Sequence, residues 1–126
     1  MNDIGSTLTA EELEFCLSVL QFYAEDIERT LQEEELSGEE REHLTAFSEN
    51  LDRIQDQFLL ADNQFKSADL LVVCHLTEDH RDLLNEALDE ADLFGEDRQT
   101  AQQLLRTANS ILRKLKKYFR SFGIEA

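Results

Sequence analysis

Apolar residues recur along this chain at alternating steps of three and four positions, in four separate stretches. This spacing puts each set of residues on one face of an α-helix. The pattern predicts four amphipathic helices that bury their apolar stripes against one another. The stripes are Leu13, Leu17, Leu20, Ala24, Ile27 and Leu31; Leu44, Phe47, Leu51, Ile54, Phe58, Ala61 and Phe65; Leu70, Val73, Thr77, His80, Leu84, Ala87, Ala91 and Phe94; and Ala101, Leu105, Ala108, Leu112, Leu115, Phe119 and Phe122.

Capping residues indicate where these helices begin. Thr9 with Glu12, and Ser37 with Glu40, have the spacing of a capping box. Asp97 is the expected cap of the last helix. The expected helices span roughly residues 10–35, 38–64, 67–94 and 97–122, closed by the glycines at 95 and 123, and residues 1–8 form a flexible N-terminal tail.

The boundary between the second and third helices has two interpretations, because neither glycine nor proline marks it. A break near Ser67 gives four helices of similar length, whereas Thr77 offers better cap chemistry. We prefer Ser67. Short links then give an antiparallel, up-down-up-down four-helix bundle.

Composition supports an all-α fold in a single domain, residues 1–126. The chain has no proline and only four glycines, too few for the turns of a β protein. Its longest uninterrupted apolar run, Leu70 to Cys74, is far too short for a membrane span. With no signal peptide evident, the two cysteines are expected to be reduced thiols of a cytoplasmic protein.

Charge is distributed unevenly. The net charge is −16, and residues 1–97 hold 27 acids against 5 bases, whereas residues 98–126 hold 7 bases against 1 acid. Such an acidic chain repels phosphates, so we expect no direct binding to nucleic acid. The acid excess fits mimicry of nucleic acid, but it also fits adaptation to a salty cytosol.

The stretch from Ser67 to Leu84 gathers Cys74, His75 and His80, the residue types of metal sites and nucleophilic catalysis. His80 falls on the apolar stripe, and His75 points well away from it, since five residues on a helix are ~140° apart. Acids surround Cys74, and they oppose formation of a thiolate. We interpret Cys74 and His80 as core residues.

Four carboxylates, Glu25, Glu28, Glu49 and Asp52, have spacings used by all-helical Mg-dependent nucleotide pyrophosphohydrolases. On the helical wheel they do not converge, so they are kept only as an alternative metal set, and no cofactor is predicted.

Two patterns around the histidines are incomplete. Glu40 and His43 have the Glu-x-x-His spacing of di-iron bundles, but only one copy is present. A histidine phosphotransfer domain usually has lysine and glycine three and four residues after its histidine, and none of the three histidines does. Neither pattern predicts a site.

Two surface features carry the functional prediction. Phe15, Val19 and Phe22 form a second apolar stripe on the first helix, which predicts an interface with a twin subunit or another protein. The alternative is an irregular bundle that buries both stripes itself. The last helix has a basic face, which fits an acidic partner or a solvated surface. This face consists of Arg106, Arg113, Lys114, Lys116, Lys117 and Arg120.

We therefore expect a non-catalytic protein-binding module of adaptor, chaperone, immunity or regulatory type, acting through Phe15, Val19 and Phe22 and through its acidic surface. Its partner is another protein or a second copy. The competing expectation is a metal-dependent all-α enzyme such as the pyrophosphohydrolases.

Overall fold

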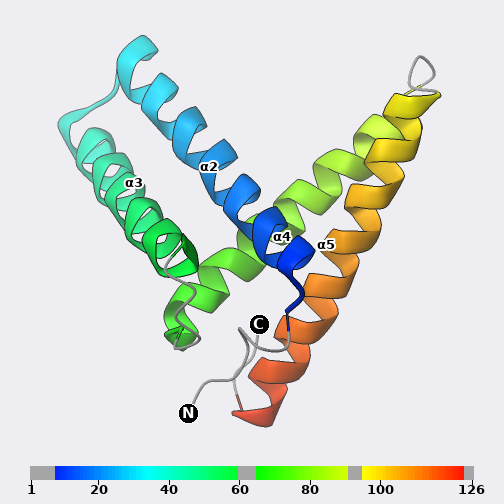
Figure 1. The fold of residues 1–126 in the computed structure, drawn as a ribbon. Coiled ribbons are helices and arrows are strands. Elements are labelled where there is room, and N and C mark those ends of the chain that lie inside the picture. Colours follow the sequence, from blue (N-terminus) through cyan, green and yellow to red (C-terminus); the bar gives the residue numbers. More distant parts are fainter. Residues whose placement is uncertain (1–7, 60–64, 91–94, 124–126) are drawn as a thin grey trace.

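The computed structural model describes residues 8–59, 65–90 and 95–123, which form four α-helices without a strand among them. The helices are α2 (Ala10–Glu33), α3 (Gly38–Leu59), α4 (Ser67–Asp89) and α5 (Glu96–Ser121). The helices form two hairpins, α2 with α3 and α4 with α5, and within each hairpin the two helices run in opposite directions (Figure 1). The predicted all-α, up-down-up-down four-helix architecture is confirmed.

The two hairpins cross at a steep angle, and the core lies at the crossing (Figure 1). Helix α2 packs against all three other helices, whereas α3 packs mainly on α2, and α5 mainly on α4. Accordingly the buried residues of α3 lie in its second half and those of α4 in its first half. Toward the hairpin tips the predicted stripes are only half-buried, as at Leu31, Leu44 and Leu84.

The predicted helix starts are confirmed for the first three helices. Thr9 forms a complete capping box with Glu12, and the Ser37 hydroxyl accepts a hydrogen bond from the Glu40 amide at 3.1 Å. Helix α4 begins at Ser67. The alternative start at Thr77 is wrong, because the buried Thr77 hydroxyl donates within the helix to the Val73 carbonyl at 2.7 Å.

Helix α5 begins at Glu96, so the prediction that Asp97 caps it is wrong. Gly95 holds the N-cap position with φ 70° and ψ −139°, a conformation that side chains strongly disfavour. Asp97 lies in the first turn, where its carboxylate still favours the helix start. At the other end, Phe122 follows the helix and is 58% exposed, so it does not extend the buried stripe.

Helices α2 and α4 end earlier than predicted, at Glu33 and Asp89. Acidic residues at both ends oppose further helix, since the carboxyl end of a helix carries partial negative charge. A cation from the next helix compensates in each hairpin: Arg41 donates to the Leu31 carbonyl and Arg98 to the Leu88 carbonyl, both at 2.9 Å. Each turn is thereby closed by an arginine of the following helix.

An ion pair that the local sequence pattern does not predict joins α3 to the start of α4. Arg53 donates two hydrogen bonds to Asp69, at 2.9 and 2.7 Å, and the Asp69 side chain is only 4% exposed. Bidentate pairs of this kind fix orientation as well as distance.

Three expectations fall partly outside the described residues. The predicted end of the second helix at 64, the helical segment 91–94 and the tail 1–7 are not described. Leu8, however, is buried in the core, so it does not belong to a flexible tail. None of the helices within the described ranges is long and apolar enough to cross a membrane.

Candidate protein-interaction surface

The second apolar stripe of α2 is mostly internal. Phe15 and Val19 are 6% and 2% exposed, and only Phe22, at 47%, reaches the surface. The expectation of a three-residue partner face is therefore corrected. Helix α2 lies between the other helices and needs two apolar faces to cover them, so the irregular arrangement weighed as an alternative accounts for Phe15 and Val19.

His80 is the centre of an aromatic cluster at the crossing of α2 and α4. Its ring lies 5.8 Å from that of Phe15, 5.4 Å from that of Phe22 and 6.4 Å from that of Tyr23, edge to face in each case. This geometry is favourable for aromatic pairs. Burial lowers the pKa of His80, and its buried Nδ1 atom has no hydrogen-bond partner within the part of the chain that the structure describes. The predicted core role of His80 is thus confirmed in part, since the residue is half-buried.

Each of the two helices of this cluster also has a large apolar side chain that is exposed. Phe22 is held edge-on by Tyr23 and His80, and Leu83, three residues beyond His80 on α4, is 44% exposed. We call Phe22, His80 and Leu83 the Phe22 patch. Leu83 was not predicted, because it lies off the apolar stripe of α4; its only sequence signal is the Leu83–Leu84 doublet.

Three carboxylates lie near the Tyr23 phenol, the neighbour of Phe22 on α2. Burial raises the pKa of the Tyr23 phenol, and the charges of Asp79, Asp26 and Asp82 raise it further. These carboxylates, from α2 and α4, therefore act on one phenol next to Phe22. All three are exposed at the surface. We call them the acidic rim.

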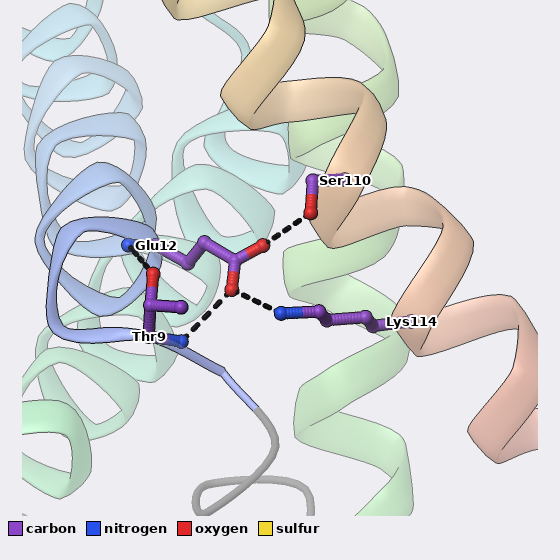
Figure 2. A network of polar contacts seen from close by, with 4 residues as sticks. All are labelled: Thr9, Glu12, Ser110 and Lys114. Carbon is purple, nitrogen blue, oxygen red and sulfur yellow. Dashed lines mark hydrogen bonds and ion pairs between the residues drawn. The ribbon is translucent and has the colours of Figure 1, made fainter.

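Glu12 forms a polar network between the start of α2 and the middle of α5 (Figure 2). Its carboxylate accepts hydrogen bonds from the Thr9 amide at 2.8 Å, the Ser110 hydroxyl at 2.6 Å and the Lys114 ammonium at 2.5 Å. Burial alone would raise the pKa of Glu12, but these hydrogen bonds and the Lys114 charge outweigh it and lower the pKa. The network joins the start of α2 to the middle of α5.

The basic face of α5 is therefore not uniform. Lys114 belongs to the Glu12 network, and Lys116 is half-buried. The other four cations, Arg106, Arg113, Lys117 and Arg120, are exposed. The sequence could not reveal the role of Lys114, because its partner lies 102 residues away.

The alternative metal set is brought closer together than the helical wheel suggested. Glu25, Glu28 and Asp52 line one open pocket between α2 and α3, but Glu49 is not among its lining residues. Glu40 and His43 are both exposed near the start of α3. Among the described residues no group of three or more histidine, cysteine or acidic side chains is placed to hold a metal ion.

The cysteines have the character of core residues. Burial raises the pKa of Cys16 to about 12, with a further contribution from Glu12. Burial raises the pKa of Cys74 to about 11. Glu78 adds to this rise, because its carboxylate accepts a hydrogen bond from Cys74 Sγ. Both thiols are fully buried, whereas His75 is exposed. The prediction that Cys74, His75 and His80 do not gather at one site is confirmed, because Cys74 is buried, His75 is exposed and His80 is half-buried.

Comparison of the chain with models of known families, with curated proteins and with solved structures finds no match in any of the three.

Proposed function

We propose that this chain is a non-catalytic protein-binding module, of adaptor, chaperone, immunity or regulatory type, that binds its partner through the Phe22 patch. The supporting observation is the Phe22 ring, which is 47% exposed yet packs against His80 and Tyr23. A rigid, partly exposed aromatic ring loses little conformational entropy on binding. Residues that dominate binding energy are often of this kind.

The acidic surface and the two buried thiols complement this proposal. Net charge of −16 keeps the chain soluble and speeds association with oppositely charged partners. Free, buried Cys16 and Cys74 fit a reducing compartment. We infer that the module works in the cytoplasm.

The test is capture of partners from native lysate by tagged protein, comparing wild type with Phe22→Ser. Removal of a central aromatic anchor is expected to weaken binding about thirtyfold or more, since such anchors contribute about 2 kcal/mol or above. Phe15→Ser is unsuitable, because it would open the core and confuse unfolding with lost binding.

The matched control is Phe122→Ser, which removes an exposed phenylalanine at the end of α5. Thermal unfolding of each variant, followed by circular dichroism, checks that the fold is retained. Equal capture by wild type and Phe22→Ser, or capture lost only in Phe122→Ser, would rule out the Phe22 patch as the binding face.

The competing proposal is a Mg-dependent nucleotide pyrophosphohydrolase: Glu25, Glu28 and Asp52 line one pocket, although as described they are not placed to hold a metal ion together. Carboxylate oxygens are the ligands that Mg²⁺ prefers. Stabilisation by Mg²⁺ or Mn²⁺ in a thermal shift assay that disappears in Glu25→Gln would support this enzyme over the binding module.

A further inference from the structure

The surroundings of the Phe22 patch carry a strong excess of negative charge. On α2, residues 22–29 include three acids and one base, and on α4, residues 78–86 include four acids and one base. Of these acids, Asp26, Asp79 and Asp82 act on Tyr23 beside Phe22, whereas Glu25 and Glu28 line the pocket with α3. A partner that covers this patch must therefore supply cations or leave carboxylates desolvated at the interface, which is costly.

The two bases near the patch do not neutralise it. Arg29 pairs with Asp26 one turn earlier on α2, and Arg81 lies 3.4 Å from its neighbour Asp82. Both pairs are at the surface, where ion pairs contribute little to stability. An incoming cation can therefore compete for Asp26 and Asp82, and Asp79 is also exposed to it.

The aromatic rings offer a second means of binding a cation. The face of an aromatic ring attracts ammonium and guanidinium groups, and arginine commonly stacks on such faces. Phe22 is about half exposed and lies one helical turn from Asp26 on α2. An arginine or lysine at this point would contact a ring and a carboxylate at the same time.

We infer that the Phe22 patch binds a basic, partly apolar segment of a different protein, with an arginine or lysine held between Phe22 and the acidic rim. This inference rests on the proposed function. A second copy of the chain could offer the basic face of α5, but two molecules of charge −16 repel each other, whereas a basic partner is attracted. The complementary charge therefore favours a different protein.

The test measures the affinity of the partner captured in the preceding experiment, after its purification, by titration calorimetry. Asp79→Asn/Asp82→Asn is compared with Glu39→Gln/Glu42→Gln, which removes the same charge at the same spacing from the exposed surface of α3. Neutralising the rim is expected to weaken binding about tenfold, and the α3 pair less than threefold. Overlapping peptides of the partner should locate binding in a segment rich in lysine or arginine.

Several outcomes would overturn the inference while the proposed function stands. These are equal effects of the two variant pairs, binding located in a neutral or acidic peptide, or capture of only the chain itself. Failure of Phe22→Ser to reduce capture, or capture of nothing by wild type, would instead remove the proposed function and the inference together.

Discussion

Glu12 shows how one residue can have both a local and a long-range role. Locally it completes the capping box with Thr9, and across the molecule it accepts hydrogen bonds from Ser110 and Lys114. The local role can be predicted from the Thr-x-x-Glu spacing alone. The long-range role cannot, because nothing in the sequence near Glu12 specifies which part of α5 will lie beside it.

Glu12→Gln should destabilise the fold by about 1–3 kcal/mol at pH 7, since the substitution removes a charged acceptor from three donors, one of them an ammonium. Chemical denaturation monitored by circular dichroism measures the change. Because folding lowers the pKa of Glu12 below 4.5, its contribution is complete above that pH and is lost as pH falls through the folded value.

The difference between wild type and Glu12→Gln should therefore shrink steadily below pH 4.5. Glu14→Gln, two residues along α2 at an exposed position, is the control and should change stability little over the same pH range. A difference that stays constant down to pH 3 would mean that the charge of Glu12 does not stabilise the network.

Among the elements, the two hairpin turns are built on a common plan. In each, an arginine from the first turn of the second helix donates to a carbonyl near the end of the first helix. The turns differ in their glycines. Gly38 has space for a side chain, whereas Gly95 has φ 70° and caps α5 in a conformation available almost only to glycine.

Alanine substitution at the two glycines should therefore have opposite effects on stability. Gly95→Ala should destabilise the protein by about 1–3 kcal/mol because its backbone conformation strains a side chain. Gly38→Ala should be neutral or stabilise by up to about 1 kcal/mol, since alanine favours helix. Urea denaturation of both variants measures the effects, and a neutral Gly95→Ala would show that the turn tolerates another conformation.

For the whole molecule, the sequence predicts the number, order and direction of the helices, because capping and heptad spacing are local signals. It does not predict that the hairpins cross. A heptad stripe shows which face of a helix is apolar, but not which helix covers it or over what length. Leu84 and Leu44 are therefore only half-buried, whereas Phe15 and Val19 are in the core.

The candidate surface was predicted only in part for the same reason. The sequence singles out Phe22, but His80, Asp79 and Asp82 of α4 come near Phe22 and Tyr23 only because α2 crosses α4. Likewise the pair of Arg53 and Asp69 depends on the approach of α3 to α4. Contacts between helices that are distant in sequence decide which exposed residues form one surface.

The most direct test of the central claim is photo-crosslinking from position 22. Phe22 is replaced by benzoylphenylalanine in the full chain, the protein is irradiated in native lysate, and mass spectrometry identifies the crosslinked peptides. The same probe at Glu28, on the side of α2 that lines the pocket with α3, is the control. We predict a specific crosslink to another protein from position 22 and none from position 28. Crosslinks from position 28 alone, equal crosslinks from both positions, or none from position 22 would contradict the claim that the Phe22 patch is the binding surface.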